Sequence, residues 1–151
     1  MQTVINRKLA LGVVGEFLDS TVKKVDSYVL DSTDNIIGTA FTRVSDSVAE
    51  KGGAGEFAGL LVLPKQYVNY NSSIGSTNLI PRGTQASLAK TGRIIANVGG
   101  TANVGDLVFF YDNSGELGVG TAGAGQTQIP NCKIFRYDVE ANGLCVLELF
   151  N

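Results

Sequence analysis

One stretch, residues 103–118, constrains the fold most because it alternates turn and strand signals and leaves no room for a helix. Gly105-Asp106 opens a turn, since glycine adopts the positive φ that tight turns need. The run LVFFY at 107–111 is apolar or aromatic at every position, which is typical of a deeply buried strand. Asp112-Asn113-Ser114-Gly115 supplies the next turn, so the stretch predicts a β-hairpin.

Similar short runs, separated by turn signals, continue from about residue 24 to the end of the chain. We expect strands at 24–30, 36–44, 56–63, 66–70, 78–80, 85–90, 92–98, 107–111, 116–119, 132–139 and 144–150. Residues 44–51 are the one candidate for a helical turn, and 118–128 is expected to form an exposed, mobile Gly-rich loop. Many short strands at this spacing predict an all-β sandwich or barrel.

The composition agrees with a single turn-rich domain. The chain has 151 residues, the size of one domain, and holds 19 glycines against 3 prolines, as expected for many tight turns. Charged residues make up 17% of the chain, below the roughly 25% of ordinary soluble domains. Such a surface suits a protein that is covered by partners.

The N-terminal residues 1–23 alternate poorly and precede the first clear strand, so we expect an arm at 1–23 and one β domain at 24–151. The arm combines two basic residues with an apolar cluster; these are Arg7, Lys8, Leu9, Leu11, Val13, Val14 and Phe17. Two interpretations stay open. The arm buries its apolar residues on a neighbouring subunit, or it is an edge strand of its own domain.

Catalytic and metal chemistry find little support. There is no histidine, which removes the usual general base and the commonest metal ligand. Cys132 and Cys145 flank a predicted turn that places Cys145 opposite residues near 139, so we expect free, buried thiols and no disulfide. The carboxylates are scattered among turns. We therefore expect no enzyme, no metal and no cofactor.

Three further classes of ligand or partner are not expected: a dinucleotide, a membrane and nucleic acid. The motif GVGTAG at 118–123 matches the dinucleotide-binding fingerprint in letters, but residues 124–130 cannot form the helix that the fingerprint needs. The longest apolar run, 57–63, is too short to cross a membrane. Acids outnumber Lys133 and Arg136 in residues 94–151, which offers no basic patch for nucleic acid.

Several segments, taken in order, resemble the structural cement, or capsid decoration, proteins of tailed bacteriophages. They are GEF at 15–17, IGTAFT at 37–42, GEFAGLLVLPK at 55–65, ANVGDLV at 102–108, and the closing segments 130–137 and 144–149. The resemblance implies a jelly-roll-like β-sandwich and no catalysis. Together with the arm at 1–23, the expected fold is an all-β, jelly-roll-like β-sandwich or barrel with an extended N-terminal arm. It further implies a virion protein on the outer surface of the assembled head, where it lies between major capsid protein subunits and stabilises the shell.

For such a protein, assembled in the host cytoplasm, we expect a homodimer, with a trimer as the alternative, because closed symmetry is common among homo-oligomers. The expected contacts with the capsid or a neighbouring subunit are Arg7, Lys8, Leu9, Leu11, Val13, Val14 and Phe17. A competing hypothesis is a carbohydrate- or receptor-binding β module of a phage tail. Tyr67, Tyr70 and Tyr111 would then be its stacking platforms.

Overall fold

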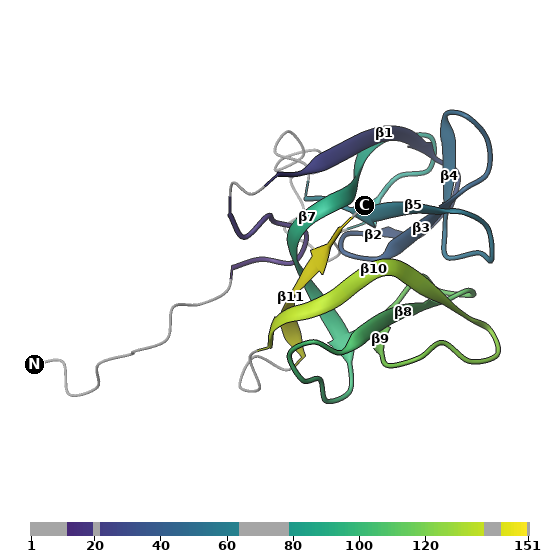
Figure 1. Cartoon of the computed structure of the whole chain (residues 1–151). Coiled ribbons are helices and arrows are strands. Elements are labelled where there is room, and N and C mark those ends of the chain that lie inside the picture. The colour runs from purple at the N-terminus through teal and green to yellow at the C-terminus, as the bar shows by residue number, and fades with distance from the viewer. Residues whose placement is uncertain (1–11, 20–21, 64–78, 138–142, 151) are drawn as a thin grey trace, which may run out of the picture.

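The computed structural model describes residues 12–19, 22–63, 79–137 and 143–150. All the regular secondary structure in these ranges is β-strand (Figure 1). The strands are β1 (Lys24–Leu30), β2 (Asn35–Ile36), β3 (Ala40–Arg43), β4 (Val48–Lys51), β5 (Phe57–Leu61), β6 (Leu79–Ile80), β7 (Gln85–Gly99), β8 (Leu107–Tyr111), β9 (Leu117–Val119), β10 (Gln126–Tyr137) and β11 (Leu144–Leu149). The all-β prediction is confirmed. No helix capable of spanning a membrane occurs in the described ranges.

Nine of these strands form one large sheet, and β2 and β6 form a separate pair. The large sheet closes on itself twice and so forms two rings that share β7. One ring follows the order β1-β4-β3-β5-β7, with β1 pairing back to β7. The other follows β7-β11-β10-β8-β9, with β9 pairing back to β7. The first half of β7 pairs with β1 at 85–91, and the second half pairs with β11 at 92–97. Figure 1 shows β7 running from one group of strands into the other.

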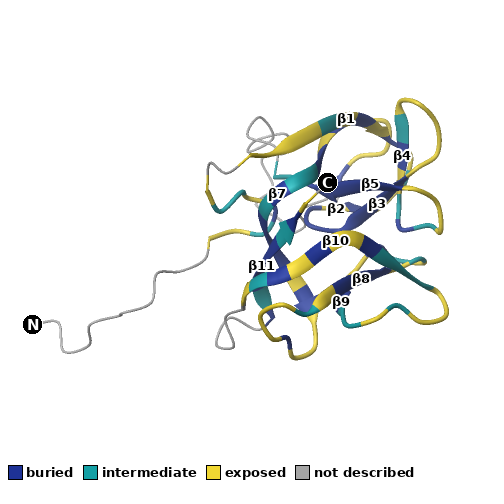
Figure 2. Ribbon diagram, viewed as in Figure 1, coloured by how far each residue is buried: buried dark blue, intermediate teal, exposed yellow. Residues whose placement is uncertain are grey.

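Each ring has its own hydrophobic core. The smaller core consists of Tyr28, Leu30, Ile37, Phe41, Ala49, Ala58, Leu61, Ile80, Ala86 and Leu88. The larger core gathers side chains from both halves of the chain, among them Phe57, Phe110, Ile134 and Leu147. Strand β5 contributes to both cores, and all its residues are buried (Figure 2). This double burial explains why 57–61 is apolar at every position.

A β-bulge in β5 distributes its side chains between the two cores. Phe41 pairs with Gly59 and Thr42 pairs with Phe57, so Ala58 is the extra residue. Phe57 and Leu60 consequently enter the larger core although a regular strand would place them on opposite faces. Gly59 has φ of 151°, and a Cβ on it would lie 2.8 Å from the carbonyl oxygen of Ala89. The close approach of β5 to β7 therefore requires glycine.

The predicted hairpin at 103–118 is confirmed. Strand β8 pairs antiparallel with β9, with Phe110 opposite Leu117. Residues 108–110 are buried, as the apolar run predicted. Gly118 belongs to β9, and a Cβ on it would overlap the Phe109 ring. That glycine is thus explained by packing, and the chain continues through a turn into β10 with no helix.

The predicted helical turn at 44–51 is wrong. Residues 44–47 bend, and 48–51 form β4, which pairs antiparallel with β3 and parallel with β1. The side chain of Arg43 bridges the bend, because its Nε donates to the Ser45 carbonyl at 3.1 Å and its Nη2 meets Asp46 at 2.9 Å. Pairing with two strands satisfies the backbone of this segment better than an isolated helical turn does.

Other boundaries also differ from the sequence predictions. The expected strands 85–90 and 92–98 are one continuous strand, β7. The expected strand 36–44 is divided into β2 and β3 by a turn that contains Gly38, with φ of 84°. The loop predicted at 118–128 is shorter, because β10 starts at Gln126 and pairs there with Tyr111. The predicted strand 66–70 lies outside the described residues.

Cys132 and Cys145 are free and buried, as predicted. Strand β10 pairs Tyr137 with Cys145 and Cys132 with Leu149, which separates the two cysteines along the ladder. Burial raises the pKa of Cys145 to about 12 and also raises the pKa of Cys132. Neither thiol is thus available as a thiolate at neutral pH.

The bulge in β5 leads to a stability prediction. Gly59→Ala should lower the free energy of unfolding by roughly 2–4 kcal/mol, because it combines a disfavoured φ with overpacking against β7. Gly83→Ala is the matched control: Gly83 has φ of 83° but open space around its Cβ position, so only the backbone cost of about 1–2 kcal/mol applies. Urea unfolding of both variants measures the difference. Equal costs would contradict the close approach at Gly59.

Candidate functional site

Residues 12–19 lie against β7 and form part of the described domain. The N–H of Gly15 donates to the carbonyl of Ile95 at 2.8 Å, and the N–H of Ile95 donates to the carbonyl of Glu16 at 2.8 Å. The N–H of Leu18 donates to the carbonyl of Arg93 at 2.9 Å. Gly15 has φ of 90°, and a Cβ on it would overlap Ile37. The segment is thus seated on its own domain by backbone bonds and close packing.

The structure divides the predicted contact residues into three groups. Phe17 is half-buried and packs against the chain's own larger core. Val14 is half-buried beside Gly38, while Val13 is 50% exposed. The remaining four, Arg7, Lys8, Leu9 and Leu11, lie outside the described residues. Residues 14–18 therefore contact their own domain, which agrees with the second interpretation of the arm. The contacts with the capsid or a neighbouring subunit stay a prediction.

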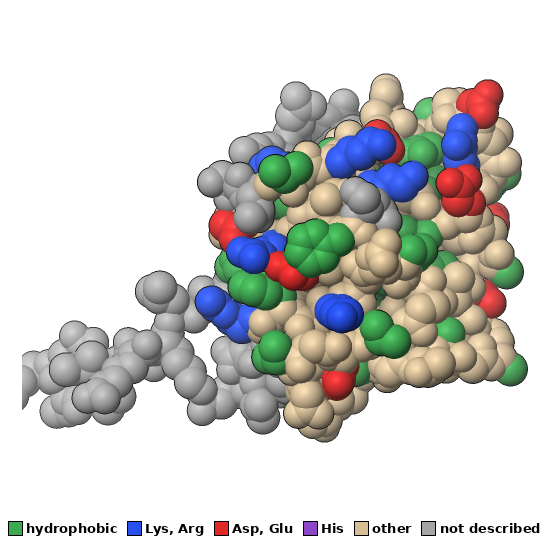
Figure 3. Space-filling model, in the orientation of Figure 1, with side chains coloured by type: hydrophobic (Ala, Val, Ile, Leu, Met, Phe, Trp, Pro, Cys, Tyr) green, Lys and Arg blue, Asp and Glu red, His purple; other side chains and the backbone are tan. Residues whose placement is uncertain are grey.

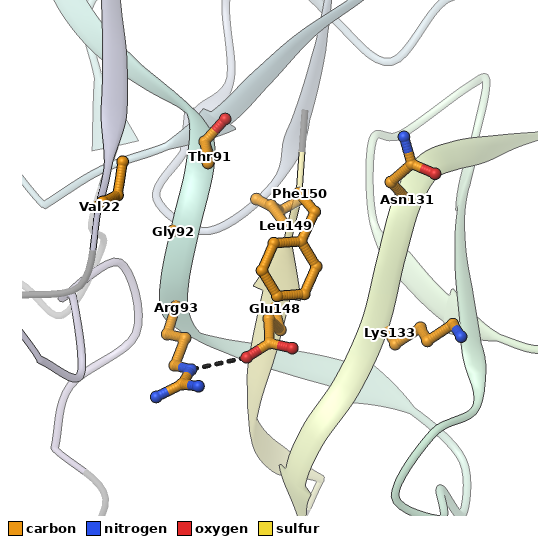
Figure 4. A pocket seen from close by; sticks show the side chains of 9 residues that line it. All are labelled: Val22, Thr91, Gly92, Arg93, Asn131, Lys133, Glu148, Leu149 and Phe150. Carbon is orange, nitrogen blue, oxygen red and sulfur yellow. Dashed lines mark hydrogen bonds and ion pairs between the residues drawn. The ribbon is translucent and has the colours of Figure 1, made fainter.

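A groove of about 740 Å³ lies where β7, β10 and β11 meet, beside the start of β1. It is lined by Val22, Thr91, Gly92, Arg93, Asn131, Lys133, Glu148, Leu149 and Phe150. Figure 4 shows the Phe150 side chain standing between the wall that carries Val22 and Thr91 and the wall that carries Asn131 and Lys133. The groove thus brings together segments that are far apart in the sequence.

Arg93 occupies one wall of this groove in a network of close contacts. Its Nε meets Glu148 Oε2 at 2.7 Å, and its Nη1 meets Asp19 Oδ2 at 3.0 Å. The guanidinium also lies 4.0 Å from the centre of the Phe135 ring. The hydrogen bonds to Glu148 and to Asp19 raise the pKa of Arg93 above its ordinary value. Arg93 therefore connects residues 12–19 to β7 and β11.

Cationic side chains gather around the groove. Of the nine Lys and Arg residues that the structure describes, six belong to this region; they are Lys23, Lys24, Lys90, Arg93, Lys133 and Arg136. The connection of Lys23 is direct, because its Nζ lies 4.6 Å from the centre of the Phe17 ring, which packs beside Gly92. Figure 3 shows Lys and Arg side chains among hydrophobic ones on this face.

This gathering was not expected from the sequence. The cations lie at 23–24, 90–93 and 133–136, and residues 94–151 taken alone carry an excess of acids. Only the pairing of β7 with β1 and β11 brings them together. The alternation of apolar and polar residues along the strands was a usable signal, since Lys133 and Arg93 each lie between two buried residues and therefore on the outer face of the sheet.

A second groove, of about 400 Å³, lies beside Val14 and includes Asn97, Tyr111 and Glu116. Tyr111 is 39% exposed, and its ring meets Phe109 edge-on at 5.4 Å. Of the three tyrosines expected to act as stacking platforms, Tyr111 is thus partly accessible, whereas Tyr67 and Tyr70 lie outside the described residues. In the described ranges no group of three His, Cys, Asp or Glu side chains is placed to hold a metal ion.

The Arg93 network leads to a second stability prediction. Arg93→Ala should lower the free energy of unfolding more than removal of a single exposed ion pair does, since it removes two partly exposed ion pairs and a stacking contact. Arg82→Ala is the control, because Arg82 has one exposed partner, Asp31, and should cost less than about 1 kcal/mol. Chemical denaturation compares the two. A cost for Arg93→Ala no larger than the control's would contradict a structural role for the network.

Comparison with known proteins now identifies the family. No curated protein matches the chain. A chain from a solved structure described as the capsid of Myoviridae phage XM1 matches 99% of this chain and 96% of its own length, with a TM-score of 0.70 and 13% sequence identity, which shows a shared fold. The match to a family covers residues 1–150 and is the structural cement protein family (E217 gp24/Pam3 gp6). The chain therefore belongs to the structural cement proteins of bacteriophage capsids, a family with a structural role.

Proposed function

We propose that this protein binds the outer surface of the assembled phage head, between major capsid protein subunits, and stabilises the shell. Membership of the structural cement family over nearly the whole chain carries this proposal. The fold of a chain from the phage XM1 capsid supports it. The site supports it as well, because the groove between β7, β10 and β11 is open and combines exposed apolar and cationic side chains. The chain would be assembled onto heads in the host cytoplasm and remain in the virion.

Stabilisation follows from many modest contacts. A head repeats the same binding site over its whole surface, so each bound copy joins neighbouring subunits and adds its contact energy to that of the others. When one copy touches two subunits, the second contact is intramolecular and benefits from a high effective concentration. A rigid domain suits this task, since little conformational entropy is lost on binding.

The N-terminal arm is the first proposed contact. Residues 15–18 are held on β7, so the chain before them starts from a fixed position on the domain. Leu9 and Leu11 would each contribute roughly 1.5–3 kcal/mol if fully buried on a neighbouring subunit or on the capsid. Arg7 and Lys8 would meet capsid carboxylates, which helps encounter and register more than affinity. Val13, half exposed, would extend the same contact.

The oligomer is proposed to be a homodimer, because a two-fold interface lets one surface serve both partners and is the commonest closed symmetry. Light scattering of the purified full chain should give twice the monomer mass of 15.9 kDa. Three times the monomer mass would establish the trimer instead. The mass of a monomer, measured at high protein concentration, would reject the dimer and the trimer.

The shell-binding proposal is tested on heads of the phage that encodes this chain. Purified virions should contain it in amounts near those of the major capsid protein, as quantitative mass spectrometry measures. Trace amounts would favour the competing hypothesis, a carbohydrate- or receptor-binding β module of a phage tail. Absence from the virion would reject the cement function. Heads assembled without the chain should break open at a lower temperature than complete heads do. Adding the purified protein should raise that temperature again.

Two deletions separate the arm from the domain. Removing residues 2–11 should reduce binding to such heads at least tenfold while the β domain stays folded, because Leu9 and Leu11 are lost. Removing 2–17 should also lower the melting temperature, since Gly15 and Phe17 contact β7 and the larger core. Circular dichroism monitors folding in both. Full binding by the 2–11 deletion would reject the arm contact and leave the cement function intact.

A further inference from the structure

We propose that the groove between β7, β10 and β11 docks an acidic segment of the major capsid protein that carries an apolar side chain. We call this surface the basic groove and define it by the nine lining residues together with Lys23, Lys24 and Arg136. The inference rests on the proposed function and specifies which face meets the shell and what chemistry it recognises.

Exposed apolar side chains form the centre of the basic groove. Val22 is 87% exposed, the highest value among the large hydrophobic residues that the structure describes, and Phe150 is 60% exposed. Phe150 is held in place because its N–H donates to the carbonyl of Asn131 at 3.0 Å. Two exposed hydrophobic residues in one groove, Val22 on a wall and Phe150 between the walls, are unfavourable in water and are typical of an interaction site.

The charges around this centre favour an acidic partner. Asp19 and Glu148 are both bound to Arg93, so this cation is already neutralised within the fold. Lys24, Lys133 and Arg136 are exposed and form no ion pair within the described residues. They carry positive charge on a chain whose net charge is −2. The field at this face is thus opposite in sign to that of the whole protein and would steer carboxylates toward it.

The same charges weigh against two other occupants. The arm of a second copy carries Arg7 and Lys8, which the cations of the basic groove would repel. Nucleic acid would place phosphates near Asp19 and Glu148 and would leave Val22 and Phe150 without an apolar partner. A peptide segment with carboxylates on both sides of an apolar residue matches the cations at the rim and the hydrophobic centre together.

The size of the basic groove fits a segment of chain. Its volume of about 740 Å³ lies within the range of roughly 300–1,000 Å³ typical of pockets that hold a compact ligand. Several side chains of an extended peptide fit such a space, whereas a flat protein face would leave it empty. The docked element is therefore expected to be a loop or terminal segment of the capsid subunit.

The test uses the full chain and heads of its phage assembled without it. One variant reverses charge at the rim, Lys133→Glu with Arg136→Glu, and a second removes the apolar centre, Val22→Ser with Phe150→Ser. Control variants make the same kinds of change at exposed positions elsewhere: Arg43→Glu with Arg82→Glu, which also breaks the ion pairs to Asp46 and Asp31, and Val44→Ser with Val104→Ser. Thermal unfolding and the solution mass are measured for every variant to establish that fold and oligomer are unchanged.

Co-sedimentation with the heads then gives the affinity. We expect each groove variant to bind at least about tenfold more weakly and each control to bind within about twofold of the original chain. Raising NaCl from about 0.05 to 0.5 M should weaken the original chain more than the charge-reversed variant, because salt screens the lost attraction.

The possible failures are distinguishable. If the original chain does not bind the heads, the proposed cement function is rejected. If it binds and both groove variants bind equally well, the function stands and the basic groove is rejected as the docking face. A groove variant that changes only the solution mass would assign the surface to the oligomer. Binding of every variant to a duplex DNA probe is measured in parallel, and a groove variant that loses only this binding would assign the surface to nucleic acid. Either result overturns the proposal.

Discussion

The shared strand β7 is the constraint on which the rest of the structure depends. Its first half closes one ring by pairing with β1, and its second half opens the other by pairing with β11. Gly92 lies at the passage between the halves with φ of 131°, and a Cβ on it would lie 3.1 Å from Phe17 Cε1 and 3.1 Å from Lys23 Cβ. Glycine at this position thus allows residues 12–19 to reach the strand and allows the groove to form beside it.

Local signals in the sequence predicted the local parts of this architecture. The hairpin at 103–118 followed from its turn residues and its buried run, and β1 and β8 have the predicted bounds. Ring closure depends instead on contacts such as Val25 with Ala89, which no pattern in either segment encodes. Gly92 made β7 look like two strands, and the pairing of β4 on both edges overrode the helical signal at 44–51.

The candidate site shows the same division between local and distant information. The apolar residues at 9–17 were recognisable as needing a partner, but the sequence alone could not assign Phe17 to its own core and leave Val13 half exposed. The cations of the basic groove come from three distant segments, so their convergence depends on the two closures at β7. Phe150 gave no signal, because an aromatic residue near the end of a strand is more often buried than exposed.

Closure also determines what this protein can offer a partner. A sheet with free edges can add strands from any chain, which favours unspecific association, whereas a closed ring presents few unpaired backbone groups. Along one edge of β7, β1 covers 85–91, residues 15–18 cover the next stretch, and β9 covers 98–99. With this edge of β7 occupied, the strand offers a partner side chains and not unpaired backbone groups. Specificity then depends on where the exposed charges and apolar groups lie, and the strands concentrate both at the passage between the two rings.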